Sequence, residues 1–182
     1  MKVISTQIAR PGEVVWQGNS VTTGIYKEPV NSITVKKFYV EGDTVSDLRV
    51  HGGEHKAVYG YASEHYPFWR EAFPQMPMNW GLFGENITTE GLFENEVLIG
   101  SVYRVGSALL QVTEPRMPCY KLAAKFGTVD MIRQFMNSRK SGFYFTVIEE
   151  GTVMPGDSIE LEQSGDPGLS ILDIVNHHIK DE

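Results

Sequence analysis

The chain has 182 residues, of which 41% are hydrophobic and 21% charged, with 18 glycines and 9 prolines. These proportions are typical of one globular domain and exclude a collagen-like, low-complexity or disordered chain. The formal net charge of -7 argues against nucleic acid as a partner, although an acidic protein can still contain a local cationic pocket.

The N-terminal half shows strand patterns with one early helix. Residues 2–9 alternate with period two, 33–40 are β-branched and aromatic and end at a Glu-Gly-Asp turn, and 57–61 resemble a buried strand. A helix is expected over 64–73, with Ser63 as its cap and Pro67 in its first turn. Residues 74–85 form a long loop, a kind of connection that is often functional.

The C-terminal half continues in the same way. Further strands are expected at 86–89, 97–105, 108–113, 143–148 and 157–162, and helices at 119–126, 129–137 and in the tail 171–180. Strands at this spacing with short inserted helices predict a mainly β or α+β fold of barrel type. We expect one domain over 1–163, followed by a helical tail over 164–182 that is not a separate domain.

No segment has the features of a targeting or membrane-spanning sequence. Arg10 and Pro11 interrupt the N-terminal pattern before a signal-peptide core can form, and no apolar run is long enough to cross a bilayer. We therefore expect a cytoplasmic protein with no membrane partner and a reduced thiol.

The common nucleotide-binding loops and the metalloprotease motif are absent from the sequence. His51 and His55 have a metal-ligand spacing, but the two glycines between them argue against the helix that this spacing requires. The adjacent His177 and His178 in the tail point to different helix faces and are interpreted as solvated or packing residues.

The single cysteine, Cys119, lies in the segment EPRMPCYKL, and one cysteine excludes an internal disulfide or a multi-thiol metal site. Pro118 favours a helix start, which would place Cys119 in the first turn of the helix. That position and the nearby Arg116 and Lys121 favour the thiolate, the form needed by a nucleophile, a sulfur carrier or a soft-metal ligand. The alternative is a small buried core cysteine.

Two further segments could bind a ligand. Gly52-Gly53 allows close backbone approach, and the neighbouring Arg49, His51 and Lys56 suggest capture of a phosphate or carboxylate. The alternative is an ordinary turn with solvated charges. The segment FGENIT carries Glu85 and Asn86, which suit heterocycle recognition but are also common in turns.

Taken together and in order, these segments resemble the MOSC domain family, the molybdenum cofactor sulfurase C-terminal domain, and in particular its YiiM-like bacterial members. The matching stretches are GIYKEPV (24–30), EGDTVSDLRVHGGEHKAVYGYASEHYPFWR (41–70), FGENITTEGL (83–92), IGSVYRVGSALLQVTEPRMPCYKLAAKFG (99–127) and SGFYFTVIEEGTVMPGDSIEL (141–161). The pairing of HGG-x-x-KAVY with R-x-P-C-x-K is more specific than either motif alone.

The resemblance implies a barrel-like, mainly β fold and the molybdenum cofactor (molybdopterin); pyridoxal phosphate is not expected. It implies that Cys119 ligates molybdenum and that Lys27, Arg116 and Cys119 match the Lys–Arg–Cys grouping of the YiiM-like subgroup. Arg49, His51, Lys56, Arg116 and Lys27 could neutralise the anionic cofactor, and Glu85 and Asn86 could meet the pterin or hold the strand that does. Gly52, Gly53 and Lys121 complete the expected cofactor-binding set.

The implied activity is reduction of N-hydroxylated compounds such as N-hydroxylated purine base analogues. Cys119, Arg116 and Lys27 are its expected catalytic residues, and either Arg116 or Lys27 could donate a hydrogen bond or proton to the departing oxygen. No flavin, haem or iron–sulfur motif is present, so the electrons would come from separate donor proteins. The longer C-terminal extension of larger YiiM-like members is missing here. If that extension serves dimerisation or the binding of redox partners, the sequence does not determine whether this chain forms a homodimer or which redox partners it binds. The alternatives are a sulfur carrier with a persulfide on Cys119 and a non-catalytic cofactor-binding module.

Overall fold

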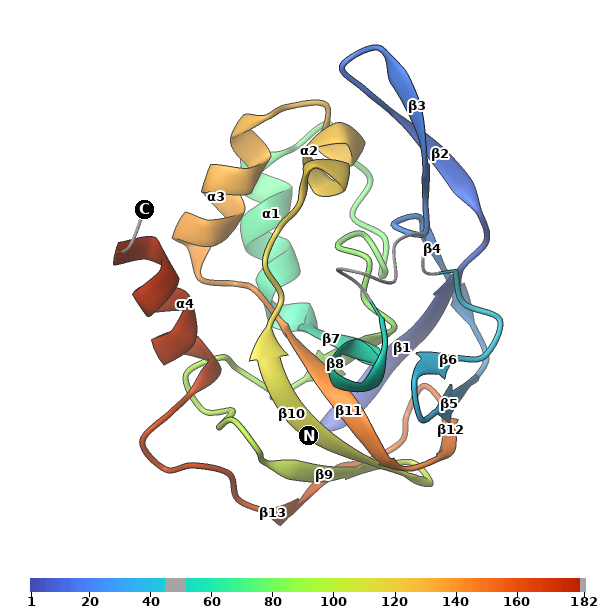
Figure 1. The fold of residues 1–182 in the computed structure, drawn as a ribbon, viewed down its shortest axis with the longest axis vertical. Helices are drawn as coiled ribbons and strands as arrows, with labels where there is room; N and C mark the ends of the chain where they lie inside the picture. The colour runs from blue at the N-terminus through green and yellow to red at the C-terminus, as the bar shows by residue number, and fades with distance from the viewer. Residues whose placement is uncertain (45–51, 181–182) are drawn as a thin grey trace.

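The structure is a computed structural model that describes residues 1–44 and 52–180. A large, strongly curved sheet forms one side of the molecule, and helices gather on the other side (Figure 1). The order of the sheet's eight strands is β13 (Ile159–Gln163), β9 (Val102–Val105), β10 (Ala108–Pro115), β11 (Phe143–Glu149), β7 (Val58–Ala62), β8 (Ile87–Glu90), β1 (Lys2–Ala9) and β4 (Lys27–Val30).

Neighbouring strands of this sheet are antiparallel except for β7 and β8, which are parallel. The crossover between those two strands carries the short turn η2 (Ser63–His65), helix α1 (Tyr66–Ala72) and the loop 74–85. A parallel pair needs such a crossover, whereas antiparallel strands can be joined by tight turns. The crossover thereby positions the loop beside the sheet.

The sheet confirms the mainly β, α+β part of the predicted fold. Among the described residues the strand order is open, with β13 and β4 at its ends. The first residues of β1 nevertheless bond to the segment that leads into β13, through Val3 N to Asp157 O at 2.9 Å and a bridge between Lys2 and Ser158. The closed barrel therefore stays a prediction.

Two small sheets flank the large one. The first is the hairpin of β2 (Gly12–Trp16) and β3 (Asn19–Thr23), which extends away from the molecule (Figure 1). The second contains β12 (Gly151–Val153), β5 (Ile33–Lys36) and β6 (Tyr39–Val40). The sequence patterns did not predict β2, β3, β4 or β12, since these strands are short and mostly exposed and so show little apolar alternation.

The predicted strand over 33–40 is wrong in one respect, because a turn at residues 37–38 divides it into the hairpin of β5 and β6. The predicted strand over 97–105 begins only at Val102, since Gly100 adopts a positive φ of 82° in a turn. Ser63 does not cap α1: it begins η2, and its hydroxyl donates to Glu64 Oε2 at 3.2 Å.

The remaining helices are α2 (Tyr120–Phe126), α3 (Asp130–Ser138) and α4 (Ile171–Lys180), and η1 (Glu54–Lys56) is a single 3₁₀ turn. Helix α4 packs against β10 and α3, with Ile171 in the core of the sheet. A second core lies between the sheet and α1–α3 and is rich in aromatic rings such as Tyr61, Trp69 and Phe83. No helix within the described ranges is long and apolar enough to cross a membrane.

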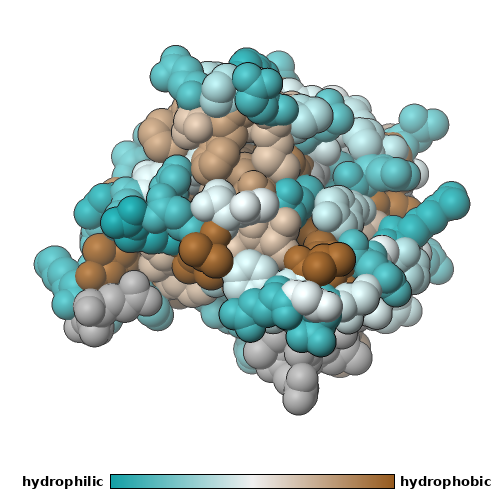
Figure 2. Space-filling view, turned by 90° about the horizontal axis from the view of Figure 1, so that it is seen from above, coloured by the Kyte–Doolittle hydropathy of each residue, from teal (hydrophilic) through white to brown (hydrophobic). Residues whose placement is uncertain are grey.

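The helical end of the molecule shows a mixed surface. Its strongly apolar residues lie in separate spots among polar ones (Figure 2). Exposed apolar side chains there include Val15 on the hairpin and Val129 before α3. Single exposed apolar residues are normal on a soluble domain and indicate no interface by themselves.

Candidate functional site

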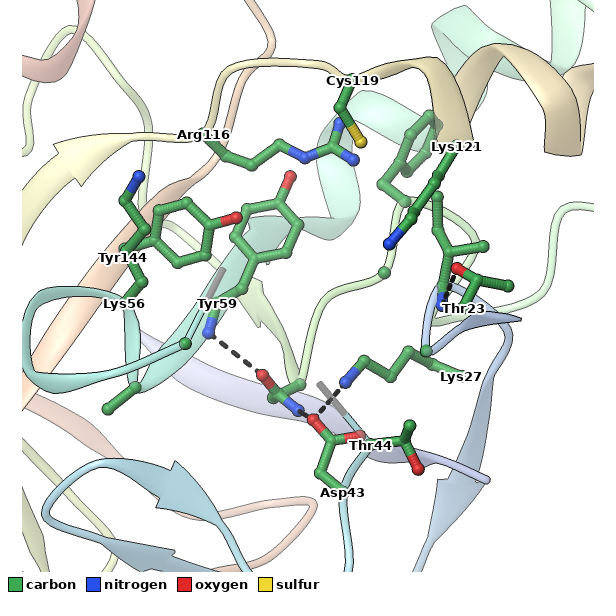
Figure 3. A pocket seen from close by; sticks show the side chains of 17 residues that line it. Thr23, Lys27, Asp43, Thr44, Lys56, Tyr59, Arg116, Cys119, Lys121 and Tyr144 are labelled. Carbon is green, nitrogen blue, oxygen red and sulfur yellow. Dashed lines mark hydrogen bonds and ion pairs between the residues drawn. The ribbon is translucent and has the colours of Figure 1, made fainter. Parts of the chain in front are cut away.

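An open cavity lies at the edge of the aromatic core, where the segment before α2 faces the start of β4 (Figure 3). The space between its walls, open solvent at the mouth included, is about 620 Å³. Its walls come from segments far apart in the sequence: 23–27, 43–44, 52–59, 83–86 and 116–121, with Tyr144 from β11.

Most of the site residues predicted from the sequence meet in this cavity: Lys27, Gly52, Lys56, Asn86, Arg116, Cys119 and Lys121. Gly53 and Glu85 do not line it. Arg49 and His51 lie outside the described residues, and so the pair of His51 and His55 is not described either. Gly52 and Gly53 have positive φ values of 75° and 80°, as expected of a Gly-Gly turn.

The sequence predicted Cys119 in the first turn of a helix. In the structure, Cys119 is instead the residue immediately before α2. Its backbone is extended, with φ -125° and ψ 170°, and its carbonyl accepts the first bond of the helix from Leu122 N at 2.9 Å. The thiol is free and partly exposed, and it points into the cavity beside the guanidinium of Arg116 (Figure 3). The extended segment therefore continues through Cys119, and the helix begins two residues after Pro118.

Arg116 is a buried cation, with 4% of its surface exposed. Its guanidinium lies over the rings of Tyr59 and Phe135, at 5.7 and 5.1 Å from the centroids. Nη1 is completely buried and has no hydrogen-bond partner among the described residues. A buried donor without a partner costs about 1–3 kcal/mol, so this nitrogen indicates a place where a ligand acceptor would bind.

Two more cations border the same space. Lys121, on the first turn of α2, is 6% exposed, and its Nζ lies 5.9 Å from the Tyr120 ring centroid. Lys56, at the end of η1, is half-buried at the rim, 3.5 Å from Glu114 Oε2 and 5.7 Å from the Tyr144 ring. Together with Arg116, they make the wall around Cys119 cationic.

The opposite wall holds a paired cation. Lys27, the first residue of β4, forms an ion pair with Asp43, and both side chains are almost fully buried. Burial lowers the pKa of Lys27, and the neighbouring Asp43 carboxylate opposes that shift. Asn86 donates to Asp43 Oδ2 at 2.8 Å, while its own Oδ1 accepts from Tyr59 N at 3.2 Å.

Glu85 is fully buried next to this wall. Its oxygens accept hydrogen bonds from Gly81 N at 2.8 Å, Phe83 N at 3.1 Å, Thr88 Oγ1 at 3.1 Å and the Tyr66 hydroxyl. Since these donors occupy both oxygens, Glu85 holds the 81–84 turn and the start of β8. This is the second of the two roles that the sequence left open for Glu85.

Sequence reasoning missed Lys125, on the last turn of α2. Its Nζ donates to Ile25 O at 2.9 Å and to Leu82 O at 2.7 Å, so it connects α2 to two other segments of the cavity wall. Burial lowers the pKa of Lys125 to about 8, with smaller contributions from Arg116 and Lys27. No motif marks this lysine, and its role depends on segments about 40 and 100 residues away.

Sequence reasoning also missed Asp43, Tyr59 and Tyr144. Asp43 was interpreted only as part of a turn, and Tyr59 only as part of a buried strand. Burial raises the pKa values of both tyrosines, while Arg116 partly opposes the shift, so both phenols stay neutral hydrogen-bond donors at neutral pH. The Tyr59 hydroxyl donates to Ser141 O at 2.7 Å.

The cavity therefore combines one free thiol with four cations and one carboxylate among its described lining residues. An anion is the ligand that such a set can hold. No cluster of three or more histidine, cysteine, aspartate or glutamate side chains could bind a metal within the described ranges. A metal at this site would need most of its ligands from another molecule.

A family comparison covers several of the segments that form this cavity. Residues 47–160 match the model of the MOSC domain, which is more than half of the chain. The chain belongs to the MOSC domain family. The match includes Arg116, Cys119 and Lys121, whereas Lys27 and Asp43 lie before it.

Relatives of this MOSC domain include proteins with and without a described function. An uncharacterized protein, YflK from Bacillus subtilis, is 42% identical and is matched over 97% of this chain and 80% of its own length. The crystal structure of YiiM from Geobacillus stearothermophilus has a TM-score of 0.80 at 37% identity, over 100% of this chain and 86% of that chain. A protein named reductase from Gibberella moniliformis is 32% identical over 86% of this chain but only 28% of its own length.

Proposed function

We propose that this MOSC domain binds the molybdenum cofactor in the cavity, with Cys119 as the protein ligand of the metal, and acts as an oxidoreductase that reduces N-hydroxylated compounds. The observation that supports this most directly is the unpartnered, buried Nη1 of Arg116 beside the Cys119 thiol. The relative named reductase supports an oxidoreductase role.

The residues present fit such a cofactor. A thiolate is a soft ligand, suited to a metal that a dithiolene already binds through sulfur. Arg116 offers a planar donor for an anionic group, and Lys56 and Lys121 add charge on the same wall. One protein thiolate is sufficient here, since the cofactor supplies its own sulfur ligands.

When bound, the molybdenum cofactor supplies the two-electron chemistry. Reduction of an N-hydroxylated compound, R–NHOH, to R–NH₂ breaks the N–O bond and consumes two electrons and two protons, and the oxygen leaves as water. The electrons would come from separate redox proteins. Lys27, across the cavity from Cys119, can donate a hydrogen bond or proton to the leaving oxygen.

The test is to purify the protein from a host that makes the cofactor and to measure bound molybdenum and pterin. We expect both in the wild-type protein, reduction of N-hydroxylated purine analogues with a chemical or protein electron donor, and loss of that reduction in Cys119→Ala. Absence of molybdenum and pterin, or unchanged reduction by Cys119→Ala, would contradict the proposal.

The same preparation separates the alternatives. A sulfur carrier would gain the mass of one sulfur atom on Cys119 after incubation with a cysteine desulfurase, and Cys119→Ala would not. A non-catalytic module would retain pterin tightly without turnover. Each of these outcomes, with no reduction of N-hydroxylated compounds, replaces the reductase proposal.

A further inference from the structure

Asp43 is the only carboxylate among the described residues that line the cavity, and it is a junction of three segments. Oδ1 accepts from the backbone N of Ala9, at the end of β1, at 2.7 Å. Oδ2 accepts from Asn86 Nδ2 at 2.8 Å and from the Lys27 amine. Both oxygens are thus used, and the side chain is 4% exposed.

The backbone of Lys27 is fixed by the same neighbours. Lys27 is the register partner of Ala9 in the antiparallel pair of β1 and β4, so Asp43 contacts both members of this pair. The Gly81 backbone packs close to the start of the Lys27 side chain, since a Cβ on Gly81 would lie only 2.8 Å from the Cβ of Lys27. From there the side chain runs along the cavity wall, with its amine against Asp43 (Figure 3).

The charge on Lys27 depends on very few groups. Burial disfavours the ammonium form and lowers its pKa; Asp43 opposes this strongly, and the more distant Glu85 adds a smaller contribution. The nearby Lys125 has its own pKa lowered in part by the charges of Arg116 and Lys27. Among the described residues, Asp43 is the carboxylate that contacts the Lys27 amine and compensates its buried charge.

We propose that Asp43 is a positioning residue that keeps the buried amine of Lys27 protonated and directed into the cavity. The inference rests on the proposed function only in its use of Lys27 as the donor to the leaving oxygen. With the Asp43 carboxylate in contact, the cavity presents a charged donor opposite Cys119. Replacing that carboxylate by an amide would favour the neutral amine, which donates more weakly and carries no charge to balance an anionic ligand.

The experiment is NMR of the full chain without cofactor, labelled with ¹³C and ¹⁵N at lysine, with the Lys27 signal assigned from its loss in Lys27→Met. In the wild-type protein we expect a hydrogen-bonded ammonium signal from Lys27 at neutral pH. In Asp43→Asn we expect the midpoint of the Lys27 titration to fall by about 1–3 pH units, because an adjacent opposite charge shifts a titration by that much. Asp43→Glu restores a carboxylate and should return the midpoint toward the wild-type value.

The matched control is Glu150→Gln, which neutralises the carboxylate of an exposed ion pair with Lys36 at 3.3 Å. This variant should leave the Lys27 signal unchanged. A purely structural role for Asp43 would lower stability in Asp43→Asn without moving the Lys27 titration, and that result would overturn the proposal. If Asp43→Asn does not fold, absence of a Lys27 ammonium signal in the wild-type protein at neutral pH overturns it equally.

These measurements use protein without cofactor, so their result does not depend on whether the chain binds molybdenum. A protein that contains no molybdenum or pterin would contradict the proposed function and leave the Lys27 result standing. An unmoved titration with normal cofactor content would contradict only the role of Asp43.

Discussion

The two walls of the cavity contain buried cations in opposite situations. On one wall, Arg116 is buried next to Cys119 with one guanidinium nitrogen unpartnered among the described residues. On the other, Lys27 is buried with a carboxylate, Asp43, in direct contact. Both cations are removed from water, but only Lys27 has its charge balanced within the described part of the protein.

This difference suits the two walls to different functions, one to binding an anionic ligand and the other to donating a hydrogen bond or proton. A buried cation with no carboxylate in contact among the described residues is unfavourable until an anion arrives, so the Arg116 wall is suited to hold an anionic ligand. A buried lysine held by a carboxylate is already satisfied and keeps a fixed direction. The Lys27 wall is therefore suited to present a donor rather than to bind the main charge of the ligand.

The strongest test of this comparison is Arg116→Met, which keeps an unbranched side chain as far as the ε position but removes the guanidinium, with its charge and the unpartnered Nη1. We expect the protein from a cofactor-competent host to lose its molybdenum and pterin, measured by elemental and pterin analysis. Thermal unfolding should show stability within about 1 kcal/mol of wild type, because the variant also removes an unsatisfied buried donor. A large loss of stability with normal cofactor content would reverse the assignment of the two walls.

The next effect concerns the support of the Lys27 wall. Glu85→Gln turns an acceptor of four hydrogen bonds into an amide that presents an N–H to backbone donors, and it should lower the free energy of unfolding by about 3–5 kcal/mol. Denaturant unfolding measures this. Glu13→Gln, at an exposed carboxylate that accepts from Ser20 at 2.6 Å, is the control and should change stability by less than about 0.5 kcal/mol. Loss of the cofactor with unchanged stability would instead place Glu85 against the ligand.

A third prediction concerns Lys125, which connects the two walls. Its folded pKa of about 8 lies below the unfolded value of 10.5, so the unfolded chain binds more protons between these values. The free energy of unfolding should therefore rise with pH across that window, by at most about 3 kcal/mol. The rise should disappear in Lys125→Met and persist in Lys37→Met, at an exposed lysine. If the free energy of unfolding of Lys125→Met rises with pH as in the wild-type protein, the Lys125 amine does not titrate in this window.

The smallest effect is expected at the rim. Lys56→Gln removes a half-exposed cation that faces Glu114 at 3.5 Å, and such pairs contribute about 0–1 kcal/mol. Stability should hardly change, and retention of the cofactor should fall only a few-fold, more at low salt than at high salt. This can be followed by dialysis at two ionic strengths. A loss as large as that of Arg116→Met would extend the ligand-binding wall to the rim.

The sequence predicted the elements that have strong local patterns. The alternation of residues 2–9 gave β1, and the apolar spacing of 129–137 gave α3 to within one residue at each end. The segment R-x-P-C-x-K marked Arg116, Cys119 and Lys121, because charge and thiol lie close together in the chain. Short exposed strands such as β2 and β12 lacked such a pattern and were found only in the structure.

What the sequence determined by itself was the chemistry available: one thiol, a set of cations near it, and a mainly β chain of the MOSC family. What the tertiary structure decided was the arrangement of charge around that thiol. Asp43 and Tyr144 reach the cavity from distant segments, and whether a buried cation has a carboxylate in contact depends on such contacts. Burial and long-range hydrogen bonds are properties of the folded chain, which is why Arg116 and Lys27 look equivalent in the sequence and differ in the structure.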